Sequence, residues 1–498
     1  MKNLVLVLLL LAGAAGTNAQ APALVEDIWK GSTGSTPGPY MSYNGALIFY
    51  ALDSLHGREL WKWSGSAAMM IANTRPGTIG AGDAVAVNAD MAVLNGKLYC
   101  AGSIGSGQTI MIYDGVNPPA PAPGCAAFTS MRSHWLNSFG GKLYFIGDTG
   151  AAKSPCLFSY DGTNPPVLHK FVGMRAAANN EHQHMAYFGG KVIFEADSDG
   201  VGPELFVLDP LTKQCGMLAD IWAGPQGSLA SQFIVAGSKL YFVASVGSGL
   251  QLYSYDGTAI VKVTSPFSGF LYAGQFNEAQ MASYRGAIFF KGHVSSNHTA
   301  LFKYDTATGI TTLVKDVHPG SDATIYQLTA TPNNLYFGGK TAAAGTELWK
   351  YDGSVCAMVA DLNPGTTTGL WPATMVAFQG GLYFTGNNGI TGNELYRVLD
   401  LPGSSGIQSA RWEAEVSLYP NPVISSAILS IGLQSNQSLH IALTDLNGRE
   451  VFNTGVLLFA SGKNEVVLPM KGLAAGQYFY RIIGSDGGAL ASGTVIKQ

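Results

Sequence analysis

The sequence predicts an all-β protein built from repeated four-stranded units, and three observations support this prediction. First, a short apolar run, a Gly- or Asn-bearing turn and a strand such as GKLYF occur together eight times between Leu24 and Leu399. Second, the period is about 48 residues, within the range of roughly 40–50 residues that is typical of β-propeller blades. Third, a second strand such as ELWKYDG follows the first.

Each repeat can be divided into four strands, which we call A to D. The segment Gln280 to Gly292 (QMASYRGAIFFKG) contains strand A, a tight turn and strand B, and Glu347 to Gly353 (ELWKYDG) is a strand C. The pair Asp352-Gly353 is expected to supply the positive φ angles of a two-residue hairpin that leads into strand D. Thr312 to Val317 (TLVKDV) represents strand D.

The two ends of the repeat region predict how a ring would close. The segment LVEDI (Leu24 to Ile28) matches a strand D, and the last repeat ends with ELYRVL (Glu394 to Leu399), which matches a strand C. Pairing the two would complete the last blade and remove two exposed sheet edges. We therefore predict an eight-bladed propeller closed by an N-terminal strand. Seven blades plus an irregular unit is the alternative, because the second and third repeats diverge and Val116 to Gly124 (VNPPAPAPG) is a poor strand.

The repeats resemble those of known propellers. The Gly-bearing A–B turn and the Tyr-Asp pair near the end of strand C resemble kelch-like propellers. The phrase ELWKYDG is similar to the ELWKSDGT repeats of secreted bacterial surface proteins. The resemblance covers about residues 24–400 and implies a propeller domain, which we place at residues 20–400. It implies no particular activity, because propellers carry many different functions.

The N-terminus has the pattern of a secretory signal. A single lysine, Lys2, precedes an apolar run from Leu4 to Leu11 and small residues up to Ala19. Residues 1–19 are therefore predicted to be a signal peptide that is removed. The apolar run is too short to span a bilayer and no other segment approaches that length, so we expect no transmembrane segment in the mature chain.

Composition and charge exclude several functions. The 63 Gly, 11% aromatic and only 12% charged residues fit a β-rich protein with many turns rather than a disordered chain. A formal net charge of −4 gives no support to nucleic-acid or anionic-membrane binding. The five cysteines lie in different repeats without a CxxC motif, which favours buried free thiols. A single pair, such as Cys125 with Cys156, is the alternative.

A different β-rich segment follows the repeats. Residues 401–412 are rich in Gly and Ser and are expected to be a linker. Residues 413–498 contain the motifs VSLYPNPV, LTDLNGREV, GLAAGQYFYRI and GTVIKQ in this order. These motifs resemble the C-terminal sorting domain of the type IX secretion system, the Por system of the Bacteroidota. The motif residues are Pro420, Asn421, Pro422, Gly448, Gly476, Tyr478 and Lys497.

The resemblance to sorting domains implies a small β-sandwich and a route of export. The domain would carry the protein from the periplasm across the outer membrane, with the type IX secretion machinery as its partner. The protein would then be secreted or displayed on the outer cell surface. A fibronectin-like module that simply stays attached is the alternative.

Candidate ligand-binding residues come from the predicted channel mouth. In kelch-like rings strand A is innermost and the D–A and B–C loops gather on one face, where loops commonly carry binding functions. The candidates before the apolar core of strand A are Asp90, His134, Trp135, His184, Glu278, Tyr326 and Trp371, with His182, Gln232 and Gln280 at related positions. This set differs from repeat to repeat, as a ligand site would. Loop tips that drift freely around a wet channel would give the same pattern.

The fourth repeat contains the most distinctive cluster of side chains. His182 and His184 alternate on an extended segment before strand A, and Asp197 and Asp199 lie in the B–C loop. Imidazole and carboxylate ligands together suit zinc or another transition metal, whereas the acidic loop alone would suit calcium. A divalent metal is therefore a candidate at these four residues, and no other cofactor is predicted. Solvated histidines and an Asp-Gly turn are the simpler explanation of the same residues.

Two positions in strand C are interpreted as structural. Glutamate opens this strand four times, and its repetition indicates a hydrogen bond to a neighbouring loop rather than catalysis. The four are Glu59, Glu204, Glu347 and Glu394. An aromatic residue two positions later, such as Trp349, is expected to pack between blades.

The sequence carries no motif that names an enzyme. GxSxG, GxGxxG, P-loop and HExxH motifs are all absent. We therefore predict a secreted or surface propeller that binds a glycan, a protein or another surface component without catalysis. An extracellular polysaccharide- or peptide-degrading enzyme with its site at the channel mouth is the alternative, and a purely structural surface-layer protein is a third.

Overall fold

The computed structural model describes residues 21–73, 91–104, 107–125, 130–148, 156–171, 185–197, 200–247, 250–263, 281–295, 298–321, 323–365, 369–401, 416–433, 436–445, 449–484 and 489–498. The chain divides into two compact units, Met1–Gly403 and Ser404–Gln498, and each is described by itself. Among the described residues there is no helix with the length and apolar character needed to cross a lipid bilayer. The predicted signal peptide, residues 1–19, lies outside the described residues.

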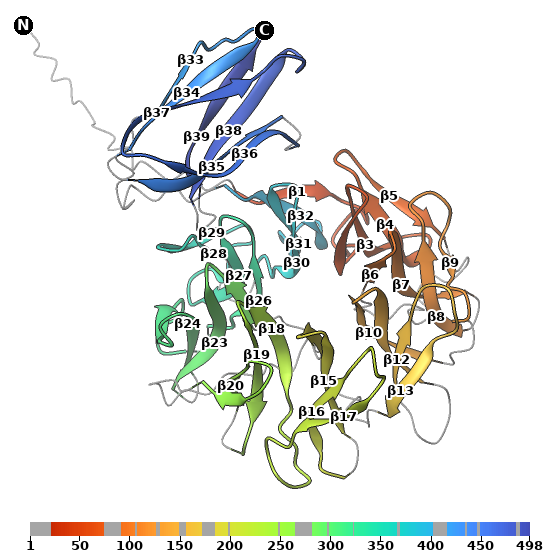
Figure 1. Ribbon diagram of the computed structural model, residues 1–498. Coiled ribbons are helices and arrows are strands. Elements are labelled where there is room, and N and C mark those ends of the chain that lie inside the picture. Colours follow the sequence, from red (N-terminus) through yellow and green to blue (C-terminus); the bar gives the residue numbers. More distant parts are fainter. Residues whose placement is uncertain are drawn as a thin grey trace, which may run out of the picture. The chain divides into compact units, whose positions relative to one another are not determined.

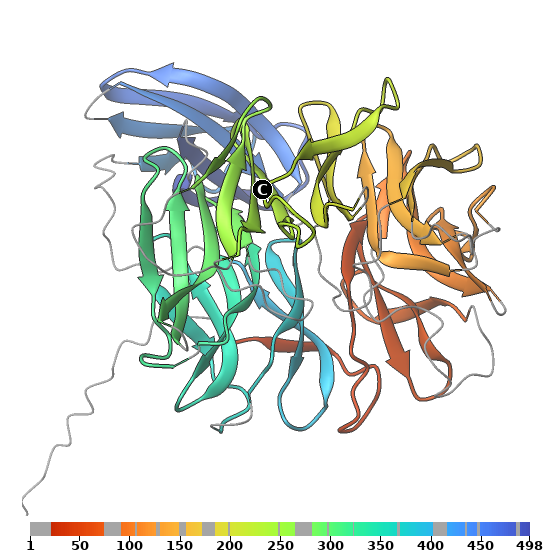
Figure 2. The same cartoon turned by 90° about the horizontal axis from the view of Figure 1, so that it is seen from below.

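The described residues of the first unit form eight four-stranded antiparallel sheets, numbered 1 to 8 by the order of their strands A (Figure 1). In sheets 1 to 7, four consecutive strands pair in the order A-B-C-D. Figure 2 shows the same sheets after a turn of 90°. The strands of sheets 1 to 4 are β2 (Tyr40–Tyr43), β3 (Ala46–Asp53), β4 (Gly57–Trp63), β5 (Ala68–Ala72), β6 (Met91–Leu94), β7 (Lys97–Ile104), β8 (Gly107–Tyr113), β9 (Ala120–Pro121), β10 (Ser130–Phe139), β11 (Lys142–Asp148), β12 (Cys156–Tyr160), β13 (Val167–Phe171), β14 (Met185–Phe188), β15 (Lys191–Asp197), β16 (Pro203–Leu208) and β17 (Cys215–Ala219).

Sheet 8 combines both ends of the first unit. Its order is β30-β31-β32-β1, so the first strand of the described chain occupies the position of a strand D. β1 pairs antiparallel with β32, with Leu24 opposite Tyr396. The strands of sheets 5 to 8 are β18 (Ser231–Ala236), β19 (Lys239–Ser245), β20 (Leu250–Tyr255), β21 (Ile260–Lys262), β22 (Met281–Tyr284), β23 (Ala287–Ser295), β24 (His298–Asp305), β25 (Thr311–Lys315), β26 (Tyr326–Ala330), β27 (Leu335–Thr341), β28 (Gly345–Tyr351), β29 (Cys356–Ala360), β30 (Ala373–Phe378), β31 (Gly381–Asn387), β32 (Asn393–Leu399) and β1 (Ala23–Glu26).

The two kinds of tight turn in each sheet have different backbone conformations. In the A–B turn of sheet 1, Asn44 and Gly45 both have positive φ angles, 48° and 74°, as a type I′ hairpin requires. The C–D turns differ from the sequence prediction, because at Asp352-Gly353 only the glycine has a positive φ, 104°. Asp352 Oδ1 instead accepts hydrogen bonds from the backbone N of Ser354 (2.9 Å) and Val355 (2.7 Å). The aspartate therefore caps the turn with its side chain.

Aromatic side chains of strands B and C lie against each other in sheets 3 to 8. The ring centroids of Phe337 and Trp349 lie 6.3 Å apart in sheet 7, and those of Phe384 and Tyr396 lie 5.9 Å apart in sheet 8. The strand-C aromatics were predicted to pack between blades, and this is confirmed for Trp349, which shares a buried cluster with Phe289 and Leu301 of sheet 6. Its ring partner Phe337 lies across the same strand pair. Such offset pairs add to the burial energy of the two rings.

All five cysteines are free thiols. Cys125 and Cys156 belong to the same buried cluster, yet they form no disulfide. Buried free thiols were expected, and Cys100, Cys125 and Cys156 are buried, whereas Cys215 and Cys356 are only partly buried. Burial raises the pKa of the Cys125 thiol to about 12, so it behaves as an apolar group in the core.

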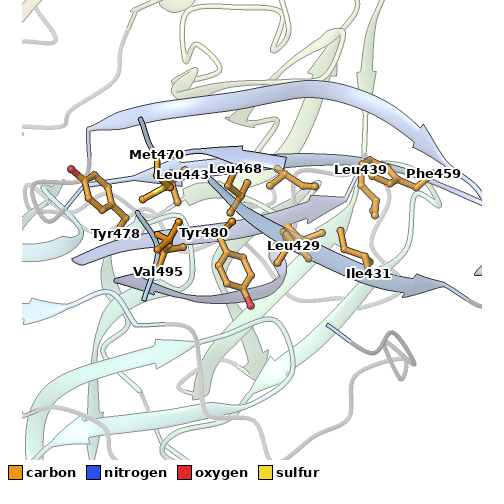
Figure 3. Close-up of a cluster of buried hydrophobic side chains, with 14 of the residues drawn as sticks. Leu429, Ile431, Leu439, Leu443, Phe459, Leu468, Met470, Tyr478, Tyr480 and Val495 are labelled. Atoms are coloured by element: carbon orange, nitrogen blue, oxygen red, sulfur yellow. The ribbon is translucent and has the colours of Figure 1, made fainter. Parts of the chain in front are cut away.

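The second unit consists of two sheets that share one apolar core (Figure 3). The core includes Leu429 and Ile431 from one sheet and Leu439, Leu443 and Ile482 from the other. One sheet has the order β33-β34-β37 and the other β36-β35-β38-β39. Their strands are β33 (Val416–Tyr419), β34 (Ser426–Leu433), β35 (Gln437–Thr444), β36 (Glu450–Phe459), β37 (Gly462–Pro469), β38 (Gly476–Gly484) and β39 (Ala489–Lys497).

Candidate functional site

An open cavity of about 660 Å³ lies among strands of the first unit. Its lining comes mainly from strand A of seven sheets, so strand A is innermost, as expected. The polar lining residues are Asn137, Ser283, Gln327, Thr329 and Thr374. The larger apolar and aromatic ones are Tyr40, Met41, Met91, Phe233, Met281 and Met375. Among the described lining residues, the phenol of Tyr40 is the one ionisable group, so this part of the channel is uncharged.

A network of hydroxyl groups fixes the polar wall of the cavity where sheets 8 and 1 meet. Tyr40 Oη and Thr385 Oγ1 are hydrogen-bonded at 2.8 Å, and Thr385 Oγ1 is 3.0 Å from Thr374 Oγ1. Thr374 Oγ1 also donates to the carbonyl O of Pro37 at 3.4 Å. Burial raises the pKa of Tyr40, so this phenol stays neutral across the physiological range.

In four sheets the described D–A loop lies beside the end of strand B, where the B–C loop begins. The backbone N near the end of strand B donates to a carbonyl O in the D–A loop in several sheets. These bonds join Leu52 to Ser35 (2.8 Å), Ser245 to Ser228 (2.7 Å), Lys340 to Ala323 (2.7 Å) and Asn387 to Leu370 (2.7 Å). The same bond therefore holds the D–A loop against the end of strand B in each of these four sheets.

Two of the seven main ligand-binding candidates have described side chains, and they differ in exposure. Gln232, at a related position, is also described, lies in β18 and is 5% exposed. Trp371, in the D–A loop before β30, is 47% exposed, and its backbone N donates to the carbonyl O of Thr346 at 3.1 Å. Tyr326 is only 5% exposed, because its ring packs against the bare backbone of Gly338, where a Cβ atom would lie 2.5 Å from the ring. Tyr326 therefore belongs to the packed sheet, and its neighbour Gln327 lines the cavity instead.

Most of the other predicted site residues lie outside the described part of the chain. Asp90, His182, His184, Asp199, Glu278 and Gln280 lie outside the described residues, and His134 and Trp135 are described only as backbone within β10. Asp197 is the last residue of β15 and pairs with Pro203. Within the described part of the chain, no group of three His, Cys, Asp or Glu side chains is placed to hold a metal ion.

The glutamate that opens strand C is a clamp between neighbouring sheets. Glu394 is 0% exposed and accepts four hydrogen bonds from the D–A segment that follows β1. The donors are the backbone N of Ile28 (3.2 Å), Trp29 (3.1 Å) and Ser35 (2.8 Å) and the hydroxyl of Ser35 (2.5 Å). Burial raises the pKa of Glu394, and the hydrogen bonds oppose that increase. We call this arrangement the glutamate clamp.

The same clamp recurs between sheets 4 and 5. Glu204 accepts hydrogen bonds from the backbone N of Ile221 (2.9 Å) and Trp222 (3.1 Å) and from the hydroxyl of Ser228 (2.6 Å). A third clamp, at Glu347, binds the backbone N of Leu370 at 2.9 Å. The predicted structural role of the repeated glutamate is confirmed for these three residues, since each binds the adjacent loop. Buried carboxylates remain stable only when they are hydrogen-bonded in this way.

Glycine allows the loop to approach the clamp. A Cβ atom on Gly34 would lie 2.3 Å from the backbone N of Asn393, and one on Gly227 would lie 2.4 Å from Pro203. Both glycines also have positive φ angles, 74° and 69°. A side chain at either position would therefore push the loop away from its carboxylate.

In the second unit, the predicted sorting residues join the first described strand to the last one. Between Pro420 and Pro422, Asn421 Nδ2 donates to the carbonyl O of Thr494 (2.9 Å), while Asn421 Oδ1 accepts from the backbone N of Ile496 (2.8 Å). The motif thus covers the outer edge of β39, which would otherwise be an unpaired strand edge.

Three further sorting residues lie on β38 and β39, which pair with each other. Gly476 opens β38 with a φ of 154°, and Tyr478 is 6% exposed and donates to the carbonyl O of Ala474 at 2.9 Å. Lys497 ends β39 and forms a bridge with Val423. Gly448 lies outside the described residues.

Comparison with known proteins identifies the second unit. Residues 417–497 match the family described as secretion system C-terminal sorting domain. The predicted resemblance of this part of the chain is confirmed, and the match indicates export by the type IX secretion system to the cell surface or the medium. No curated protein matches the sequence.

Solved structures are similar to this chain only at a low level. PorZ, an essential surface component of the type IX secretion system of Porphyromonas gingivalis, is 13% identical with a TM-score of 0.37, covering 94% of this chain and 70% of its own. The β-propeller domain of the Trilobed protease from Pyrococcus furiosus is 11% identical with a TM-score of 0.42, covering 66% of this chain and 99% of its own. A puromycin hydrolase is 12% identical with a TM-score of 0.44, and the match spans 71% of this chain and 58% of the enzyme. At these values the similarities say nothing about activity, and a specific likeness to kelch repeats is not among them.

Sequence reasoning missed Gln327 and Thr374 as channel residues. Both have positive φ angles, 54° and 35°, and each lies within an irregularity of the A–B register. They share a place three residues after Thr324 and Trp371, which also have positive φ angles, but this conformation is visible only in the structure and no sequence signal marks it.

Proposed function

We propose that this chain is an exported, non-enzymatic binding protein: an eight-bladed propeller closed by β1 and carried to the cell surface by its sorting domain. After removal of residues 1–19 it passes through the periplasm, and the type IX machinery then recognises the C-terminal unit. The observation that supports export is the match of residues 417–497 to the sorting-domain family.

The proposed ligand site is the channel mouth on the face of the D–A and B–C loops. A cavity of about 660 Å³ is within the range of roughly 300–1,000 Å³ for small-ligand sites. Its described lining offers neutral hydrogen-bonding groups beside apolar side chains, and Trp371 presents an exposed aromatic ring nearby. Neutral polar groups with an aromatic surface suit a glycan or another uncharged surface component.

The uncharged lining favours binding over catalysis. Acid–base catalysis requires a carboxylate, imidazole or similar group within hydrogen-bond reach of the substrate. The described cavity wall offers amide, hydroxyl and thioether groups instead. We therefore rank the degrading enzyme, with catalytic groups contributed by other loops, as the second function.

A glycan array tests the proposed function. The mature full-length protein is applied to the array together with two variants, Trp371→Ala and Leu211→Ala. Leu211 is 91% exposed and lies between β16 and β17, on the opposite face, so it serves as the matched control. We expect binding that is at least about tenfold weaker in Trp371→Ala and unchanged in Leu211→Ala. Binding that is equal in all three proteins, or release of shortened products from the array, contradicts the proposal.

A further inference from the structure

The clamp between sheets 7 and 8 differs from the other two in one residue. Ser35 and Ser228 donate their hydroxyls to the second carboxylate oxygen of Glu394 and Glu204. Leu370 occupies the same place in the third clamp, because its carbonyl O accepts the same bond from the end of strand B as those of the two serines. Leucine has no hydroxyl, so this clamp lacks the bond that completes the others.

The missing hydroxyl leaves one oxygen of Glu347 unsatisfied in a buried place. Glu347 and Leu370 are both 0% exposed. Oε1 accepts a hydrogen bond from the backbone N of Leu370 at 2.9 Å. The backbone N–H of Leu362 also acts on the carboxyl, but among the described residues no group forms a hydrogen bond of normal geometry with Oε2. A buried anionic oxygen without a donor is costly, and a protonated carboxyl avoids that cost.

The surroundings of Glu347 supply no compensating positive charge. Asp361, on the loop after β29, is the ionisable neighbour that acts on the carboxyl, and it has the same sign. The strands β29, β30 and β31 carry no acidic or basic side chain, and β27 contributes Lys340, which pairs with Thr346. Burial, followed by the smaller effect of Asp361, outweighs the backbone N–H groups of Leu370 and Leu362 and raises the pKa of Glu347 to about 7.

We propose that the seam between sheets 7 and 8 is a proton-dependent latch, which closes most tightly when Glu347 is protonated and loosens when it ionises. The latch holds the backbone N of Leu370, and the next residue, Trp371, stands at the channel mouth. Loosening of the seam therefore frees the loop that carries this tryptophan. The latch concerns the seam itself and does not depend on which ligand the channel binds.

The direction of the pH effect follows from linkage. The closed seam holds the proton more tightly than the open seam, in which Glu347 returns to its ordinary pKa of 4.5. The proton therefore stabilises the closed seam fully below about pH 4.5, and this stabilisation is lost as the pH rises to about 7. Between pH 5 and pH 8 the opening constant is expected to rise by roughly 10- to 100-fold.

Hydrogen-exchange mass spectrometry of the full-length protein tests the latch. A peptide covering residues 369–375 reports the amides of Leu370 and Trp371, after correction for the intrinsic dependence of exchange on pH. In the unaltered protein we expect the opening constant to rise by roughly 10- to 100-fold between pH 5 and pH 8. In Glu347→Gln, whose amide does not ionise, we expect an opening constant that hardly changes with pH. The ratio of the opening constants at pH 8 and pH 5 is taken within each protein, so it stays informative when the variant is less stable overall.

The Glu204 clamp provides a reference in the same sample. The opening constant of a peptide covering residues 221–229 is expected to change less between pH 5 and pH 8, because Ser228 donates a hydrogen bond to Glu204. Equal opening constants at pH 5 and pH 8 for residues 369–375, or an undiminished pH dependence in Glu347→Gln, would overturn the proposal.

Discussion

Replacement of Glu394 by alanine should release the N-terminal segment that completes sheet 8. The carboxylate accepts four hydrogen bonds from Ile28, Trp29 and Ser35, and Ser35 is 0% exposed. Loss of the acceptor leaves the buried Ser35 groups unsatisfied, at about 1–3 kcal/mol. The half-buried amides of Ile28 and Trp29 can bind water instead. We therefore expect a total loss of about 2–4 kcal/mol.

Hydrogen exchange measures this loss of stability in the N-terminal segment itself. If the segment opens locally, a loss of about 2–4 kcal/mol raises the opening constant by roughly 30- to 700-fold. The peptide covering residues 23–36 should show this increase in Glu394→Ala. Glu204→Ala is the matched control, because it removes the same kind of clamp from the interior of the chain.

The comparison of the two variants separates closure from general stability. Glu204→Ala should raise exchange in residues 221–229 and leave residues 23–36 protected. Unchanged exchange of residues 23–36 in Glu394→Ala would refute the reasoning, since the segment would then be held by other contacts. An equal increase in both variants would mean that the clamp acts on the whole unit and has no special part in closing it.

Two further predictions concern packing and sorting. Gly338→Ala should destabilise the first unit by about 2–4 kcal/mol, because its Cβ would lie 2.5 Å from the ring of Tyr326. Denaturant unfolding measures this loss, with Gly216→Ala as the control, since a Cβ there meets nothing within 4 Å. Equal losses of stability in the two variants would contradict the prediction. Asn421→Ala should destabilise the second unit by about 1–3 kcal/mol, because two hydrogen bonds to β39 are lost. It should also lower the amount of protein on the cell surface, measured by protease shaving, and full surface display would refute that expectation.

The strand order of the first unit is predictable because its signals are repeated. Apolar alternation marks each strand, and the segments LVEDI and ELYRVL overlap β1 and β32, which pair with each other. The structural role of Glu204 and Glu394 could also be predicted from the sequence, since a carboxylate that recurs at one position of the repeat indicates a structural role rather than catalysis. The sorting motif around Asn421 was readable for a similar reason, because several short motifs occur in a fixed order.

The candidate site was less predictable, because it depends on register. Tyr326 and Gln327 are neighbours, and an irregularity in the pairing between Tyr326 and Thr329 decides which of them reaches the cavity. A strand pattern alone cannot locate such an irregularity. The aromatic partner of Trp349 depends in the same way on which strand lies opposite.

The central claim is that the C-terminal unit exports a separately folded propeller, and a truncation tests it most directly. Cells of a bacterium with a type IX secretion system would produce the full chain or a chain that ends at Leu401, and surface, periplasm and medium would be assayed by antibody. The account predicts that the full chain reaches the surface or the medium, while the truncated chain stays in the periplasm in a folded, protease-resistant form. Truncated protein on the surface would contradict the assignment of export to residues 417–497.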